Sequence, residues 1–379
     1  MNTGLKQYPF YMKSTVIIFG LVLTCYSLSN LKSILAPIAF ALLLSILLNS
    51  LVNKLQRRGV KKIPAISISL VIGVLIVGGI LYFISTQIMN FSENLPVLKV
   101  KFNQQIAELQ KWVAANLKVP VVRQQKLLKD ALEGSQSLFG TALGGAFSVV
   151  GFVFLIPIYC FLLLYYKPLI LNFFHESFAE ENTGKVSAVL GETKSAVKSY
   201  MVGLLLEALI VAIMNSVALL LLGVDYAILL GVIGALLNML PYIGGLVGIA
   251  LPIIIASVTK DGFSTQLGIL GAYLLIQFID NNFLVPFLVS SRVKINALIS
   301  IIVVLLGGAL WGVAGMFLSI PVIAILKIIF DRLPEMRPWG KLLGDEVPTR
   351  HKGEIWSLRR KRKEEIAEKI ADTVERPPG

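Results

Sequence analysis

Three polar side chains interrupt an apolar stretch near residue 280 and could bind a solute there. Gln277, Asp280 and Asn281 are spaced i, i+3 and i+4, so a helix would place them on one face. Asn282 follows them, and Pro286 lacks the amide hydrogen that would bond to the carbonyl of Asn282. A carboxylate, side-chain amides and a freed carbonyl in one place suit a polyhydroxylated solute or a cation. The competing interpretation is a hydrogen-bonded cluster that caps the helix and joins it to its neighbours.

A second polar pair lies inside the apolar run 201–222. Glu207 and Asn215 are eight residues apart, which separates them by about 80° around a helix, so one polar groove could hold both. A carboxyl group in apolar surroundings can carry a proton. Equally open is a single carboxylic acid that is bonded to a neighbouring helix.

A third constellation breaks the run 226–258. Asn238 is followed by Pro241, Tyr242, Gly244 and Gly245. A proline removes one helical hydrogen bond and paired glycines allow a sharp bend, so backbone groups become free to coordinate a ligand. A hinge or a tight helix crossing without a ligand explains the same residues equally well.

The run 298–330 contains a similar break. Its glycines are Gly307, Gly308, Gly312 and Gly315. A straight helix of 33 residues would be about 50 Å long, more than the roughly 30 Å of a bilayer core. We therefore predict that 226–258 and 298–330 are each broken, and we favour hairpins that enter and leave by one face over single crossings.

The composition requires a membrane around these segments. Hydrophobic residues make up 56% of the 379 residues and charged residues only 15%, against about 25% charged in soluble domains. We predict an all-α polytopic protein with about eight hydrophobic segments, two of them broken or re-entrant. The expected segments are 14–29, 33–52, 65–85, 143–166, 201–222, 226–258, 263–285 and 298–330.

The bases between these segments predict how the chain faces. The net charge is +13, and the loop between the second and third segments holds five bases without an acid: Lys54, Arg57, Arg58, Lys61 and Lys62. By the positive-inside rule this loop is cytoplasmic, and both chain termini then lie in the cytoplasm. The bases carry no interleaved aromatic residues, which argues against a nucleic-acid site.

Four regions follow from this topology. Residues 1–85 form the first three spans, and 86–142 form a helical extracytoplasmic insertion with an amphipathic helix over 102–113. Residues 143–330 form the transport core, including a cytoplasmic amphipathic helix at 176–200, and 331–379 form a charged cytoplasmic tail. We expect the insertion to pack against neighbouring subunits or the membrane surface, with a lid over a substrate as the alternative.

Several chemistries lack their residues. The chain has two cysteines, Cys25 and Cys160, and two histidines, His175 and His351, so we expect neither a disulfide framework nor a metal site. The motifs GxxxxGK[ST], HExxH and GxSxG are absent, which excludes the nucleotide-driven pump, metalloprotease and hydrolase that they mark. We expect no enzyme activity and no cofactor.

Three stretches together resemble the autoinducer-2 exporter family of permeases. They are NMLPYIGG at 238–245, QFIDNNFLVP at 277–286 and GGALWGVAGMFLSIPV at 307–322. The resemblance implies a bacterial inner-membrane protein with eight membrane segments that moves small solutes without ATP and forms homo-oligomers, described as pentamers. By this resemblance, the family's Asn-x-x-Pro-Tyr-x-Gly pattern corresponds to Asn238, Pro241, Tyr242 and Gly244. Its Gln-x-x-Asp-Asn pattern corresponds to Gln277, Asp280, Asn281 and Asn282. Where members of that family commonly have Gly-Pro after the tyrosine, this chain has Gly244 and Gly245.

Three functions compete at this point. The first is a secondary transporter or facilitator that exports a small polar solute, with the quorum-sensing signal autoinducer-2 as a candidate. The second is a sodium(lithium)/proton antiporter that uses Asp280 or Glu207. The third is a non-transporting envelope scaffold, for which substitutions at both acids would be silent.

Overall fold

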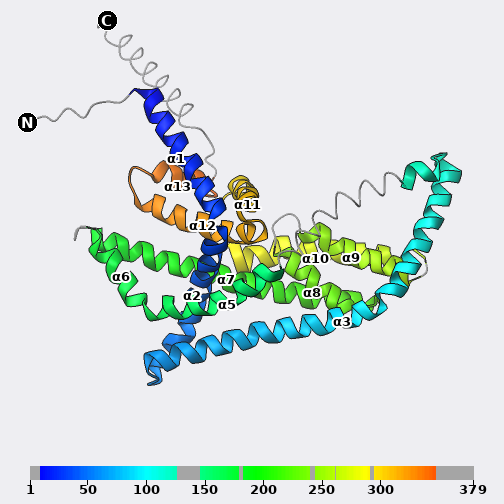
Figure 1. Ribbon diagram of the computed structural model, residues 1–379, viewed down its shortest axis with the longest axis horizontal. Helices are drawn as coiled ribbons and strands as arrows, with labels where there is room; N and C mark the ends of the chain where they lie inside the picture. Colours follow the sequence, from blue (N-terminus) through cyan, green and yellow to red (C-terminus); the bar gives the residue numbers. More distant parts are fainter. Residues whose placement is uncertain are drawn as a thin grey trace, which may run out of the picture.

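The computed structural model describes residues 9–125, 146–178, 182–239, 244–260, 262–290 and 294–346, and the regular elements in these ranges are all helices (Figure 1). Their bounds are α1 (Phe10–Asn30), α2 (Lys32–Arg57), α3 (Lys62–Leu117), α5 (Ala146–Tyr165), α6 (Lys167–Glu176), α7 (Thr183–Leu221), α8 (Ala227–Asn238), α9 (Gly244–Thr259), α10 (Ser264–Ile279), the π-helix η2 (Asp280–Ser290), α11 (Ala297–Trp311), α12 (Val313–Arg332) and α13 (Arg337–Leu343).

Five helical segments in the described ranges are long and apolar enough to cross a bilayer: Lys32–Arg57, Lys62–Asn94, Thr183–Leu221, Ser264–Leu288 and Val313–Arg332. The bent pair α5 and α6 gives a sixth if it counts as one span. Helices are the natural result of these runs, because every backbone amide in hydrocarbon must bond within its own segment. The prediction of an all-α polytopic membrane protein is confirmed.

The run 226–258 folds back on itself. Helices α8 and α9 are separated by residues 239–243 and pack against each other. At their contact a Cβ on Gly248 would lie 3.3 Å from the Cα of Gly234, so only glycines permit this approach. Pro241 and Tyr242 lie outside the described residues. The break predicted here is present, and it produces a hairpin of two short helices.

The run 298–330 is also a hairpin. Gly312 separates α11 from α12 with φ of +64°, a conformation that glycine adopts without strain. A Cβ on Gly307 would lie 2.5 Å from the carbonyl oxygen of Gly315, which shows how closely the two arms pack. Helix α13 lies against α12. The backbone N–H of Asn296, the residue before α11, donates to the Leu343 carbonyl at 3.1 Å. The hairpin therefore starts and ends at the same end of the molecule.

Two predicted region boundaries differ from the structure. Helix α3 does not end near residue 86; it continues to Leu117, with Pro96 inside it, and its outer half turns away in Figure 1. The helix predicted at 176–200 is not separate: residues from Thr183 onward are the start of α7, which runs unbroken into its span. In both cases the amphipathic sequence continues the helix of the adjoining span, because a helix can extend beyond the bilayer without a break.

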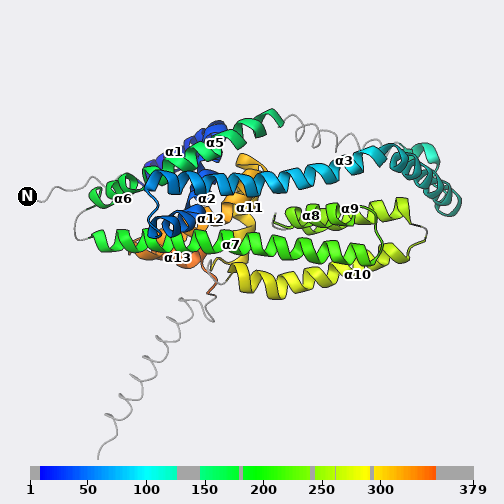
Figure 2. The same cartoon turned by 90° about the horizontal axis from the view of Figure 1, so that it is seen from below.

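Contacts between helices define two ends of the bundle. At one end the outer half of α3 meets α8 and α9, where the Phe91 and Tyr226 rings pack edge to face at 5.1 Å. At the other end Arg332 of α12 pairs with Glu192 of α7. Figure 2 shows α3 and α7 running along the length of the molecule between these ends, with α10 beside α7 toward the end that holds α8 and α9. We call them the α8–α9 end and the α12–α13 end.

An apolar layer holds the elements that carry the polar residues. Val211 of α7, Ala235 of α8 and Ile276 of α10 are buried together. A larger cluster lies next to it toward the α8–α9 end and includes Leu219 and Ile269. The two clusters fix α7, α8 and α10 around a common axis, and the site lies between them.

Candidate functional site

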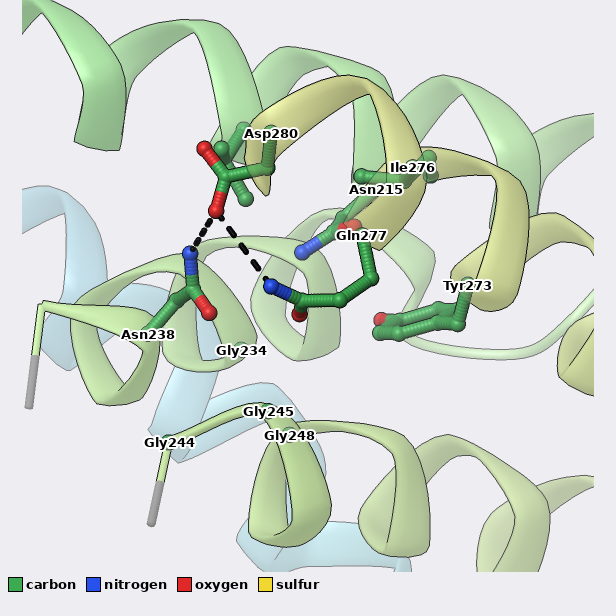
Figure 3. A pocket seen from close by; sticks show the side chains of 11 residues that line it. Asn215, Gly234, Asn238, Gly244, Gly245, Gly248, Tyr273, Ile276, Gln277 and Asp280 are labelled. Atoms are coloured by element: carbon green, nitrogen blue, oxygen red, sulfur yellow. Dashed lines mark hydrogen bonds between the residues drawn. The ribbon is translucent and has the colours of Figure 1, made fainter. Parts of the chain in front are cut away.

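A small cavity lies where α7, α8, α9 and α10 meet (Figure 3). Its volume is about 20 Å³, which is enough for roughly one water molecule. The residues that line it are Val211, Asn215, Gly234, Asn238, Gly244, Gly245, Gly248, Tyr273, Ile276, Gln277 and Asp280. Polar atoms from α7, α8, α10 and η2 and the backbone of α9 therefore face one small space inside a membrane protein.

Asp280 is the charged group of this cavity. Its side chain is 2% exposed, and the Asn238 amide donates to Oδ2 at 2.9 Å, with the Gln277 amide at 3.5 Å from the same oxygen. The other oxygen, Oδ1, is buried and has no hydrogen-bond partner among the described residues. A buried carboxylate oxygen without a donor is costly, so this oxygen is available to a hydroxyl, a cation or a proton.

Two further polar atoms at the cavity lack a partner in the described ranges. They are Oδ1 of Asn215, on α7, and the hydroxyl of Tyr273, on α10. Both side chains are buried, at 3% and 8% exposed. Together with Asp280 Oδ1 they offer two acceptors and one hydroxyl that can donate or accept. Such unmet hydrogen-bonding capacity around one space is what a polar ligand would satisfy.

Glycines provide the space between these groups. A Cβ on Gly234 would lie 3.3 Å from the Asn215 amide nitrogen and 3.5 Å from the Tyr273 hydroxyl. A Cβ on Gly245 would lie 3.0 Å from Oε1 of Gln277. Figure 3 shows Gly234 on one wall and Gly244, Gly245 and Gly248 on the facing one. Larger residues at these positions would fill the cavity.

The clustered polar residues around Asp280, where α10 passes into the π-helix η2, differ in exposure. Asp280 is buried, whereas Asn281 and Asn282 are exposed. The Gln277 amide reaches Oδ2 of Asp280 and Oδ1 of Asn281, so these three side chains lie close together, as the helical spacing predicts. Asn282 donates to the Phe278 carbonyl at 2.8 Å. Asn281 and Asn282 lie outside the cavity lining.

Glu207 lies near the cavity without lining it. Its side chain is buried on α7, at 6% exposed, and the charge of Asp280 acts on it. The polar groove predicted along α7 therefore reaches the cavity through Asn215, with Glu207 behind it. Val211, one helical turn from Glu207 on α7, lines the cavity with Asp280, so the bundle interior holds two buried acids in this region.

The remaining predicted hinge residues lie elsewhere. Gly307, Gly308, Gly312 and Gly315 belong to the α11–α12 hairpin, and Pro286 lies exposed within η2. In the described part of the chain no group of three or more His, Cys, Asp and Glu side chains could hold a metal ion.

The sequence was compared with known protein families. The model of the AI-2E family transporters matches residues 14–335, which include every element that builds the cavity. The chain belongs to the AI-2E transporter family.

Relatives of this AI-2E family protein cover most of its length. The transport protein TqsA of Escherichia coli (strain K12), named for AI-2 transport, is 24% identical over 336 residues, which are 88% of this chain and 96% of TqsA. PerM of the same strain, named as a candidate permease, is 28% identical over 80% of this chain and 88% of its own. YrrI of Bacillus subtilis (strain 168), named as a candidate transport protein, is 25% identical over 81% and 88%.

Sequence reasoning missed five lining positions of this AI-2E family transporter, the apolar Val211 and Ile276 together with Tyr273, Gly234 and Gly248. Tyr273 precedes Gln277 by four residues and Asp280 by seven, so the helical spacing that joined the latter two also reaches Tyr273. Gly234 and Gly248 lie in apolar helices with no local sign of function. They contribute through the close packing of α8 on α9, which is a property of the folded hairpin.

Proposed function

We propose that this AI-2E family member is a secondary transporter that exports a small, neutral polyhydroxylated solute through the cavity around Asp280. The observation that carries the proposal is a set of three buried polar atoms that face one space and have no hydrogen-bond partner within the described ranges. Neutral hydroxyls suit this set, because a carboxylate and an amide carbonyl accept from them without a second buried charge. Autoinducer-2, the substrate in the name of TqsA, belongs to this chemical class.

The cavity in the described conformation is too small for a solute. A cavity of about 20 Å³ holds roughly one water, so a solute enters only after the α8–α9 hairpin or the α10–η2 element moves. Broken helices at the site are the usual place for such movement in secondary transporters. The break after Asn238 and the π-helix that begins at Asp280 flank the cavity from two sides.

The family and the charge pattern supply the setting of the proposal. We place the protein in the bacterial inner membrane with both termini in the cytoplasm, because the α2–α3 loop and the helix turns on either side of it carry five bases and no acid. The apolar side chains exposed along α1 and α3 suit contact with lipid and with further copies of the chain. We expect a homo-oligomer, for which the family resemblance suggests five subunits.

A substitution at Asp280 tests the proposal. Cells that overexpress the wild type should accumulate the solute in the medium, which an unbiased metabolite comparison identifies against cells without the protein. The Asp280→Ala variant should return that level to the background. Asn282→Ala is the matched control, because its side chain bonds to the Phe278 carbonyl outside the cavity lining, and it should behave as the wild type. Unchanged export by Asp280→Ala at equal protein levels would overturn the proposal.

The two neighbouring acids favour a second candidate, a sodium(lithium)/proton antiporter. Glu207 and Asp280 are both buried, and the charge of one acts on the other, so binding a cation at one acid would favour release of a proton from the pair. Everted vesicles loaded with a pH-sensitive dye test this function. Addition of sodium should restore the dye's fluorescence with the wild type and not with Glu207→Gln. Sodium without any effect on wild-type vesicles would exclude the antiporter.

A further inference from the structure

Three lysines gather at the α12–α13 end, away from the cavity. They are Lys62, the first residue of α3; Lys167, the first residue of α6; and Lys194, near the start of α7. Burial and then the charges of Lys194 and Lys62 lower the pKa of the Lys167 ammonium. The charges that act on Lys167 are therefore both positive, and the three ammonium groups repel one another.

Neutral oxygens hold the two half-buried lysines in place. The Lys62 ammonium donates to the Tyr165 carbonyl at 2.7 Å and lies 4.9 Å from the centre of the Tyr165 ring. The Lys167 ammonium donates to Oδ1 of Asn49 at 3.1 Å, and Asn49 is itself buried in α2. These contacts position the charges without neutralising them.

No carboxylate compensates the cluster in the described ranges. The ion pairs there are Lys327 with Asp331 and Arg332 with Glu192, and neither includes a lysine of the cluster. The first turns of α3 and α6 begin at Lys62 and Lys167, and α5 ends beside them at Tyr165, so dipole ends of both signs meet there and the net positive charge comes from the lysines. An anion would relieve this concentration of positive charge.

Helix α6 shows which kind of anion fits. It turns by 58° from α5 at Tyr166 and has no buried residue. Leu169 and Phe173 are largely exposed, while Lys167 begins the helix. An exposed apolar helix with a basic end, bent away from a span, is typical of a segment that lies at the boundary between acyl chains and headgroups. The lysine cluster then lies at the depth of lipid phosphates.

We propose that Lys62, Lys167 and Lys194 form a binding site for the phosphate of an anionic phospholipid in the cytoplasmic leaflet. The acyl chains of that lipid would lie along the exposed apolar side chains of α6. Asn49 and Tyr165 position the lysines, and the bound phosphate ties α3, α6 and α7 together. The site is separate from the cavity, so it does not depend on the solute that the protein carries.

Titration of the full-length protein in detergent tests the site. Native mass spectrometry would count bound phosphatidylglycerol and phosphatidylcholine that have identical acyl chains. The wild type should bind phosphatidylglycerol more tightly, and Lys167→Gln with Lys194→Gln should weaken that binding about fivefold for each lysine removed. Lys111→Gln with Lys185→Gln removes the same charge from exposed positions outside the cluster and should leave the affinity unchanged.

Two further variants separate charge from folding. Lys167→Arg with Lys194→Arg keeps the charge and should keep the binding of phosphatidylglycerol. Asn49→Asp places a carboxylate beside Lys167 and should weaken binding with every lysine present, so the test stands even where the glutamine variants do not fold.

A second arm distinguishes a lipid from a soluble anion. Inorganic phosphate and glycerophosphoglycerol, which have the same charge chemistry without acyl chains, should not displace phosphatidylglycerol at comparable concentrations. Displacement by either one would assign the cluster to a soluble phosphate and overturn the proposal. Equal binding of phosphatidylglycerol by the wild type and the double glutamine variant would also overturn it.

Discussion

At the scale of single residues, the unequal surroundings of the two Asp280 oxygens are the feature that most needs an explanation. One oxygen accepts from Asn238, and the other is buried without a donor in the described structure. A purely structural acid would be expected to have both oxygens bonded, because an unmet buried acceptor costs about 1–3 kcal/mol. Asn215 and Tyr273 carry the same kind of unmet capacity at the same cavity. The solute-binding role that we propose for this cavity would account for three such costs occurring together.

Tyr273→Phe separates these explanations at one atom. Removal of a buried hydroxyl that has no partner should leave the melting temperature of the purified protein unchanged or raise it slightly. If the hydroxyl binds the solute, export should fall about tenfold, as expected for the loss of a hydrogen bond of about 1.4 kcal/mol. Thermal unfolding and the export assay should therefore move independently. A large loss of stability with unchanged export would show a structural role instead.

At the scale of elements, sequence pattern predicted the helices and the breaks in them, but not how the parts meet. The apolar runs, Pro241 and the paired glycines were sufficient to predict two broken segments, because length and backbone chemistry are local properties. Gln277 and Asp280 were paired by helical spacing. The contact of Asn238 with Asp280 joins residues 42 positions apart. It depends on the folded hairpin and is not encoded in local spacing.

Gly234→Ala tests whether the glycines of α8 keep the cavity open. The added Cβ would lie 3.3 Å from the Asn215 amide nitrogen and 3.5 Å from the Tyr273 hydroxyl, contacts that a small shift can relieve. We expect a folded protein with a melting temperature within a few degrees of the wild type and strongly reduced export. Gly271→Ala on α10 is the control, because its Cβ would have nothing within 4 Å. Wild-type export by Gly234→Ala would show that the cavity is not on the transport path.

Gly312→Ala tests the turn of the second hairpin. A Cβ there would meet nothing within 4 Å, so the cost comes from the backbone, whose φ of +64° and ψ of −141° suit glycine alone. We expect a loss of about 1–3 kcal/mol in the free energy of unfolding, measured by thermal or denaturant unfolding in detergent. Gly79→Ala, which is also uncrowded but lies within the regular helix α3, should cost nothing. Equal stability of both variants would mean that the turn adapts to alanine.

At the scale of the whole molecule, the two hairpins determine which loops share a side of the membrane. Because α8 and α9 fold back on each other, the loop before α10 stays at the end where α3 meets α9. Helix α10 and η2 then lead the chain away from that end, along α7, to the α11–α12 hairpin. That hairpin begins close to where it ends, since the Asn296 backbone amide donates to the Leu343 carbonyl. If 226–258 and 298–330 each crossed the membrane once instead, the loop before α10 and the loop before α11 would each lie on the opposite side of the membrane.

Cysteine labelling from outside intact cells distinguishes these topologies. In a chain with Cys25 and Cys160 replaced by alanine, single cysteines at four exposed positions report the sides: Arg58→Cys, Lys111→Cys, Ser264→Cys and Lys294→Cys. A membrane-impermeant thiol reagent should label Lys111→Cys and Ser264→Cys, while Arg58→Cys and Lys294→Cys should react only after the membrane is opened. This result follows from the hairpin contacts together with the positive-inside rule. Labelling of Lys294→Cys with Lys111→Cys, and protection of Ser264→Cys with Arg58→Cys, would instead require both runs to cross once and would contradict the hairpins on which the cavity depends.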